Sequence, residues 1–219
     1  MKKLLQVAAA AALSLVASAQ ATVISGSVTG GGALTNGGTF VKLTVPFTTN
    51  DPAQPNTVGD DNFNTFNLYA FDEEQNVLAT SLIEVDEGSD IPMGSTVASH
   101  YVFFDPPGFG TTSIQGTVTF DSAIRGVVTT RAKLNASDPF ANTGVTYLSD
   151  SLRGLESNDS VSFSGNTLTI DFRASSPGDY VRVFTDFSPG AVDPIPVPAA
   201  AWLMGAGLAG LFGVRRRAR

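Results

Sequence analysis

The residues of this chain that could do chemistry are one histidine and several groups of carboxylates. Because His100 is the only histidine, a Ser-His-Asp arrangement would have to use it as its base. It lies in "ASHYVF", an apolar stretch typical of a strand, and no serine has a recognisable nucleophile context. We therefore interpret His100 as a hydrogen-bonded residue of a core or edge strand, and we predict no catalytic residues. No HExxH or other metal-binding histidine spacing is present, which argues against zinc.

The carboxylates are grouped at three places, each in an expected loop or at the end of an expected strand: Asp60-Asp61, Asp72-Glu73-Glu74, and Asp86-Glu87 with Asp90. Calcium prefers several oxygen ligands, and loops at one end of a β-sandwich can supply them. Asp60, Asp61, Asp72 and Glu73 are accordingly the candidate calcium ligands, and no other cofactor is expected. The alternative is a solvated acidic rim, because charged runs usually face water.

A polysaccharide-active enzyme is a further alternative for the same carboxylates. A glycosidase needs two of them about 5 to 9 Å apart in a cleft. The single Trp and four Tyr offer few rings for stacking against sugars, which weighs against this interpretation.

Charge and cysteine content exclude other classes of function. Two lysines lie within residues 1–21 and four arginines within 215–219, which leaves seven basic residues against 20 acidic ones, a net charge of −13. Such a surface repels phosphate backbones, so we expect no nucleic-acid partner. Because the chain has no cysteine, it has no disulfides, and its stability must come from an apolar core. The 15 Phe residues indicate that this core is rich in phenylalanine.

The elements expected to position these residues are strands separated by turns. The expected strands are residues 37–47, 62–71, 76–85, 96–105, 113–121, 123–134, 160–163, 167–172 and 180–187. Residues 96–105 are apolar on both faces, as in a strand sandwiched within a core, whereas residues 113–121 alternate strictly. Residues 135–153 are predicted to hold a short helix or irregular turns. The pattern predicts an all-β domain over 22–187, an antiparallel two-sheet sandwich of jelly-roll or immunoglobulin-like type.

The N-terminus, residues 1–21, has the layout of a secretory signal peptide. Lys2 and Lys3 precede an apolar run, and small residues then offer cleavage after Ala19 or Ala21. Signal peptidase is therefore an expected partner. The sequence predicts that the body is exported.

The C-terminus combines a proline-containing linker, 188–195, with a tail, 196–219. The tail is uncharged over residues 199–214, which as a helix would measure about 24 Å and would span a bilayer marginally. Its glycines suit close packing against another membrane helix, and its terminal arginines favour the cytoplasmic side: Gly205, Gly207, Gly210, Gly213, Arg215, Arg216 and Arg217. We expect a single membrane helix that holds the exported body transiently at the bacterial inner membrane.

This tail resembles the PEP-CTERM family of bacterial sorting signals in its VPxPA variant. The resemblance rests on a short proline motif followed by the Gly/Leu-rich stretch and the arginine cluster: Pro196, Pro198, Ala199, Ala200 and Trp202. Ile195 occupies the usual Val position. The resemblance implies recognition by an exosortase, an integral-membrane transpeptidase of exopolysaccharide-producing Gram-negative bacteria. Phrases of the body, such as "TVASHYVFFDP", also resemble uncharacterised members of this group.

The two ends and the strand-rich body together predict an exported, exosortase-sorted protein of the cell surface or extracellular matrix. Its expected role is structural or adhesive and not enzymatic. The alternatives are a calcium-assisted exopolysaccharide-binding module and a carboxylate-based polysaccharide-active enzyme.

Overall fold

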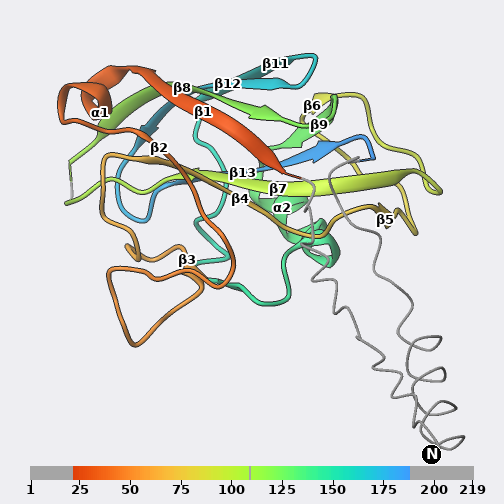
Figure 1. Ribbon diagram of the computed structural model, residues 1–219, viewed down its shortest axis with the longest axis horizontal. Helices are drawn as coiled ribbons and strands as arrows, with labels where there is room; N and C mark the ends of the chain where they lie inside the picture. Colours follow the sequence, from red (N-terminus) through yellow and green to blue (C-terminus); the bar gives the residue numbers. More distant parts are fainter. Residues whose placement is uncertain (1–21, 109, 188–219) are drawn as a thin grey trace, which may run out of the picture.

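The computed structural model describes residues 22–108 and 110–187, and these form an all-β body with several sheets (Figure 1). In chain order the elements are β1 (Val23–Gly30), α1 (Gly31–Thr35), β2 (Phe40–Lys42), β3 (Thr57–Val58), β4 (Leu68–Asp72), β5 (Val77–Leu78), β6 (Glu87–Gly88), β7 (Thr96–Phe104), β8 (Thr112–Phe120), β9 (Ile124–Val128), α2 (Arg131–Ala136), η1 (Asp138–Phe140), β10 (Thr146–Tyr147), β11 (Ser160–Ser164), β12 (Thr167–Ala174) and β13 (Asp179–Thr185). The predicted signal peptide, linker and sorting tail lie outside the described residues. Within the described ranges, no helix has the length and apolar character needed to cross a membrane.

Two sheets carry most of the strands. The smaller one has the order β1-β8-β12-β11, and the larger one has the order β2-β4-β7-β13-β9-β6 with β5 also paired to β7. All pairs within these sheets are antiparallel except β2 with β4, and a separate parallel pair joins β3 to β10. The sequence prediction of a mainly antiparallel all-β body is therefore confirmed.

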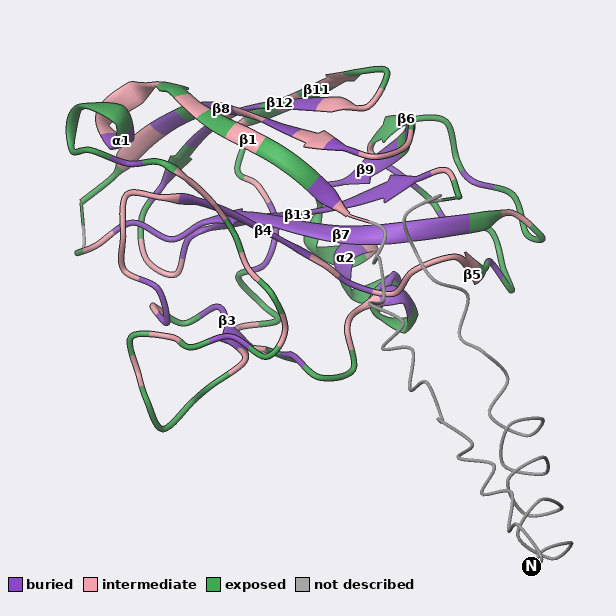
Figure 2. Ribbon diagram, viewed as in Figure 1, coloured by how far each residue is buried: buried purple, intermediate pink, exposed green. Residues whose placement is uncertain are grey.

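Strand β7 lies at the centre of the larger sheet and is buried on both faces (Figure 2). Side chains alternate along a strand, so Val97, Tyr101 and Phe103 face one side of the sheet. Val102 and Phe104 face the other side. The prediction that residues 96–105 form a strand inside a core is confirmed.

The first core fills the space between the two sheets. Leu68, Val102 and Val181 of the larger sheet are buried with Val118 and Phe172 of the smaller one. Burying one such side chain fully contributes about 1.5–3 kcal/mol. On β12 every second residue is buried, so this strand presents one apolar face to the larger sheet.

A second core, rich in aromatic rings, lies on the opposite face of the larger sheet. Tyr69 and Phe103 stack with ring centroids 5.1 Å apart, and Phe103 and Tyr180 stack at 5.8 Å. The residues that cover these rings come from the long connections, including Phe63 before β4 and Leu134 of α2. The Phe-rich interior expected from composition is found, and it is divided between two layers.

Several expected strands are shorter in the structure, and one strand was not expected. Residues 62–71 give only β4, which begins at Leu68, and residues 76–85 give only the two-residue strand β5. Residues 37–47 give only the strand β2, because the chain leaves the ladder after the Leu43 amide bonds to the Ala70 carbonyl. Residues 123–134 begin as β9 and then turn into α2, which supplies the short helix expected slightly later in the chain. Strand β1, which was not predicted, pairs with β8 at the edge of the smaller sheet.

The first and last described residues meet at one turn. The Thr22 carbonyl accepts a hydrogen bond from the Asp121 amide at 3.1 Å, and the Phe187 carbonyl accepts one from the Ser122 hydroxyl at 2.7 Å. The body therefore has an entry pole, at residues 121–123, where the chain both enters and leaves it. Strand β13 runs from the far pole, at Asp179, toward this turn, a distance of about 20 Å at 3.3 Å per residue.

Candidate metal site

The carboxylates expected to bind calcium occupy separate places, beginning with Asp72 at the end of β4. Its Oδ1 accepts a hydrogen bond from the Val23 amide at 2.8 Å and lies 2.9 Å from His100 Nδ1, while its Oδ2 lies 3.1 Å from Lys42 Nζ. His100 has no exposed surface and is also hydrogen-bonded to the Thr185 hydroxyl, as expected of a core histidine. Asp72 thus anchors the two sheets to each other near the entry pole.

Glu73, the next residue, points to the opposite face of the sheet. Its carboxylate binds the Arg182 guanidinium at 2.7 and 2.9 Å. It also accepts hydrogen bonds from the hydroxyls of Ser99, at 2.7 Å, and Tyr147, at 2.6 Å. Glu73 and Asp72 therefore serve different layers, and each has a cationic partner.

Asp60 and Asp61 lie in a turn near Asp105, at φ values of 54° and 60°. Asp105 is fully buried, and its Oδ2 accepts hydrogen bonds from the Phe63 and Asn64 amides. Burial raises the pKa of Asp105 to about 6 against the opposing effect of these amides, and the charges of Asp61 and Asp60 add to the rise. The four predicted ligands are therefore not assembled into one group.

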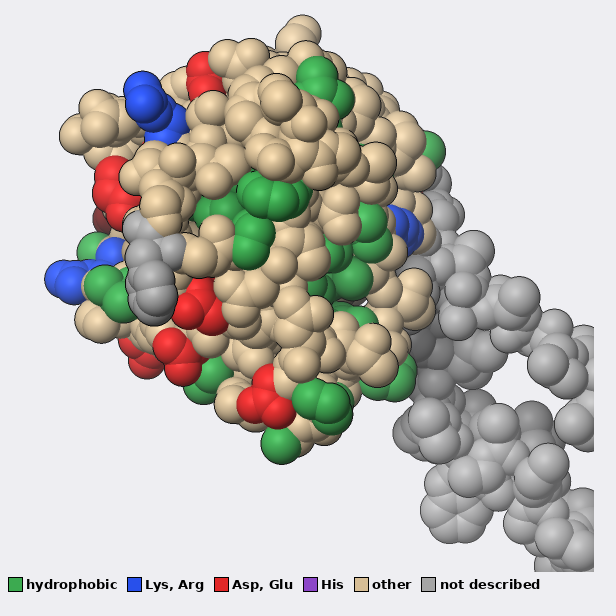
Figure 3. Space-filling model, turned by 90° about the vertical axis from the view of Figure 1, so that its left-hand side faces the viewer, with side chains coloured by type: hydrophobic (Ala, Val, Ile, Leu, Met, Phe, Trp, Pro, Cys, Tyr) green, Lys and Arg blue, Asp and Glu red, His purple; other side chains and the backbone are tan. Residues whose placement is uncertain are grey.

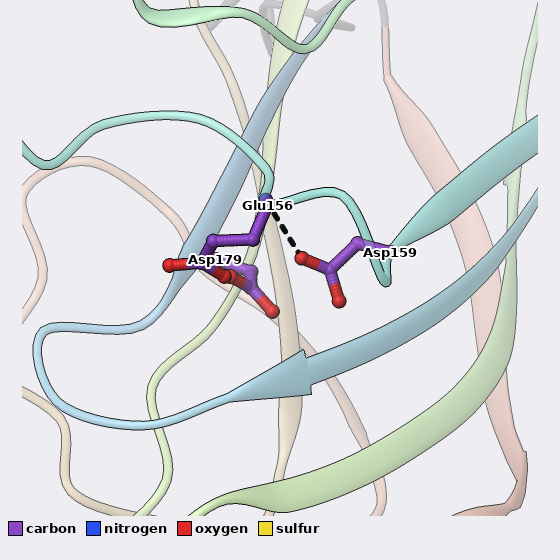
Figure 4. Close-up of side chains that lie close together, drawn as sticks. All are labelled: Glu156, Asp159 and Asp179. Atoms are coloured by element: carbon purple, nitrogen blue, oxygen red, sulfur yellow. Dashed lines mark hydrogen bonds between the residues drawn. The ribbon is translucent and has the colours of Figure 1, made fainter.

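In the part of the chain that the structure describes, one group of three acidic side chains converges: Glu156, Asp159 and Asp179. Their candidate ligand atoms all lie within 4.8 Å of one another. Glu156 and Asp159 come from the loop before β11, and Asp179 begins β13 (Figure 4). Sequence reasoning missed this group.

Local folding explains how the three residues meet. The Glu156 amide donates to Asp159 Oδ2 at 2.8 Å and the Asp159 amide donates to the Glu156 carbonyl at 3.1 Å, which closes a tight turn. The β11–β12 hairpin then brings the chain back, and the Arg173 amide donates to Asp159 Oδ1 at 2.7 Å. Gly178, at φ +98°, ends the following turn and places Asp179 beside the other two.

Three ionised carboxylates without a bound cation would repel one another in this group. Asp179 is 1% exposed, and its Oδ2 is buried with no hydrogen-bond partner. Burial, together with the charges of Asp159 and Glu156, raises the pKa of Asp179 to about 8, and burial followed by contact with Asp159 raises that of Glu156. None of the ion pairs among the described residues includes any of the three.

A hollow of about 380 Å³ adjoins this group. Its lining comes from the loop 151–156 and the turn 175–178, and Glu156 is part of it. Arg131 and Arg153 also line the hollow, and Arg153 is paired with Asp138 at 2.8 Å. One side of the acidic group is therefore open to water or to a small polar ligand.

Comparisons with known proteins add no assignment. Neither a family model, nor a characterised protein, nor a solved structure matched this chain.

Proposed function

We propose that this chain is an exported, exosortase-sorted protein of the cell surface or extracellular matrix, with a structural or adhesive role and no catalytic activity. The observation that carries the proposal is the order of features in the tail: a proline motif, an uncharged glycine-rich stretch and a final arginine cluster. A leader with a positive start, an apolar run and small-residue cleavage positions supports it from the other end.

The position of the chain ends in the body supports this proposal. Because residues 22 and 187 both attach to the turn at 121–123, a body held at a membrane by its tail would direct the far pole away from the bilayer. Figure 3 faces that end of the molecule, and acidic side chains gather along one side of it. Acidic side chains on this face, which lie beside some Lys and Arg side chains, suit solubility and cation binding outside the cell.

The finer fold that we favour is a jelly-roll-like sandwich. Consecutive strands change sheets at β7–β8, β8–β9 and β12–β13, and jelly rolls are built in this way from two facing sheets. The single histidine supports a role without catalysis, since His100 is sealed between the sheets and cannot reach a substrate from there.

Localisation in the bacterial host tests the proposal. We expect the body in the extracellular or surface fraction of wild-type cells and in the inner membrane of cells that lack the exosortase. Replacing Pro196 and Pro198 with alanine should reproduce that membrane retention. Pro194→Ala, in the linker outside the motif, is the matched control and should leave sorting unchanged. Equal distribution with and without the exosortase would refute the proposal.

A second candidate is calcium-assisted binding of exopolysaccharide, which the hollow beside Glu156 favours. Sedimentation of the protein with host exopolysaccharide tests it. Binding that is present with calcium and lost with a chelator would support this role, and no binding in either condition would remove it.

A further inference from the structure

We propose that Glu156, Asp159 and Asp179 form a calcium-binding site at the far pole of the body. All three residues belong to the folded body. Calcium binding by them requires neither sorting by an exosortase nor binding of a polysaccharide.

The spacing of the three side chains fits a single calcium ion. Calcium lies 2.3–2.6 Å from its oxygen ligands, so two ligands on opposite sides of one ion are at most about 5 Å apart. The candidate ligand atoms of the three residues are all within 4.8 Å of one another. One ion can therefore contact all three carboxylates without a rearrangement of the backbone.

Asp179 gives an independent indication that a partner belongs here. It is 1% exposed, it points into the group (Figure 4), and its Oδ2 has no hydrogen-bond partner. A buried carboxylate without a partner disfavours the folded state unless it takes up a proton or an opposite charge is bound beside it, and a bound cation would satisfy all three carboxylates at once. Among the residues that the structure describes, no lysine or arginine forms an ion pair with Asp179.

Several carboxylates elsewhere in the body show a contrast, because each has a cationic partner. Five of its seven basic side chains pair with acidic residues elsewhere: Lys42, Arg125, Lys133, Arg153 and Arg182. Asp86, for example, binds Lys133 at 2.9 Å and accepts hydrogen bonds from the amides of Thr129 and Thr130. None of the ion pairs among the described residues includes Glu156, Asp159 or Asp179, and the only backbone amides bonded to the group are those of Glu156 and Arg173, both on Asp159.

The ligand chemistry selects calcium over other metals. All three side chains offer hard oxygen atoms, which suit calcium and magnesium and not the nitrogen and sulfur sites of zinc. Calcium takes six to eight oxygen ligands in flexible geometry, and the open side toward the hollow leaves room for water to complete the shell. Magnesium demands near-ideal octahedral geometry, which one buried and two loop carboxylates do not provide.

A pair of glycosidase carboxylates is a weaker interpretation of the same group. The general acid of such an enzyme must reach the glycosidic oxygen of its substrate. Asp179, whose pKa burial raises to about 8, is almost fully buried and does not line the hollow. The geometry therefore favours a bound cation over a reaction.

Calcium titration of the purified full chain in a mild detergent tests this inference, by calorimetry and by thermal unfolding after treatment with a chelator. We expect binding heat and a rise in Tm of about 3 to 6 °C at a calcium concentration ten times Kd. Magnesium at the same concentration should give a smaller shift. Absence of both heat and a Tm shift at millimolar calcium would overturn the proposal.

Variants assign the effect to this site. Asp179→Asn is nearly isosteric and removes the buried ionisable group, so its calcium-free form should unfold at or above the temperature of the wild type while its response to calcium is lost. Glu156→Gln changes an exposed side chain and should weaken calcium binding by at least about tenfold without affecting folding. Asp150→Asn, an exposed carboxylate outside the group, is the matched control and should bind calcium as the wild type does. An unchanged calcium response in both Asp179→Asn and Glu156→Gln would show that the ion binds elsewhere.

Discussion

Arg182 and Glu73 form a bidentate ion pair in which neither side chain has any exposed surface. The same guanidinium donates to the Leu134 carbonyl at 3.0 Å and to the Ser137 hydroxyl at 2.7 Å. The pair therefore joins β13 of the larger sheet to the helix α2 that covers it. These polar contacts hold α2, and with it the aromatic core, in one position on the larger sheet.

Removing one partner of this pair should be strongly destabilising. We expect Arg182→Met to lower the free energy of unfolding by about 3–5 kcal/mol, because the Glu73 charge is then buried without a partner. The double variant Arg182→Met with Glu73→Leu should lose less than the sum of the two single variants. Urea unfolding of the four proteins measures this coupling, and strictly additive losses would contradict a direct role of the pair.

Asp105 should make the stability of the body depend on pH. Its pKa is raised from 3.8 to about 6 by burial, so between these values the folded chain holds a proton that the unfolded chain releases. The contribution of Asp105 to stability is thus fully present below about pH 4 and is lost as pH rises through 6.

Comparison with Asp105→Asn isolates this effect, because the amide does not titrate. The free energy of unfolding of the wild type, relative to that of the variant, should fall by up to about 3 kcal/mol between pH 4 and pH 7. Denaturant unfolding across this range measures it. A difference that stays constant or grows with pH would show that the carboxyl is not perturbed as described.

His100 should be chemically silent in the folded protein. With its ring fully buried and both nitrogens hydrogen-bonded, it should resist acylation by diethyl pyrocarbonate until the chain is unfolded in urea. Mass spectrometry of the modified protein checks this expectation. Rapid modification of the native form would show that the ring is accessible to solvent, which would contradict the buried position of His100.

Strands with strong apolar patterns could be predicted from the sequence. Residues 96–105 carry a continuous apolar run because both faces of β7 are buried, and residues 113–121 alternate because β8 buries one face. The segment 37–47 carries a similar alternation, and Val41, Leu43, Val45 and Phe47 do pack on the aromatic core. Most of this segment is nevertheless not a strand, because alternate side chains can pack against a core without backbone hydrogen bonds to a neighbouring strand.

The acidic group could be predicted only in part. The sequence predicts the hairpin of 160–163 with 167–172, and this pairing implies that Asp159 lies close to residues shortly after 172. Glu156 and Asp179, however, stand in turns whose sequence gives no spacing motif, and Asp179 is placed by the Gly178 turn. The β11–β12 hairpin separates Glu156 and Asp159 from Asp179, so no short stretch of the sequence contains the whole group.

Intact-mass spectrometry of the protein recovered from outside host cells tests the central claim most directly. We predict an N-terminus at Gln20 or Thr22 and a C-terminus at or near the proline motif of 196–198, without the arginine cluster. A chain of all 219 residues in the cytosol, with leader and tail intact, would contradict it.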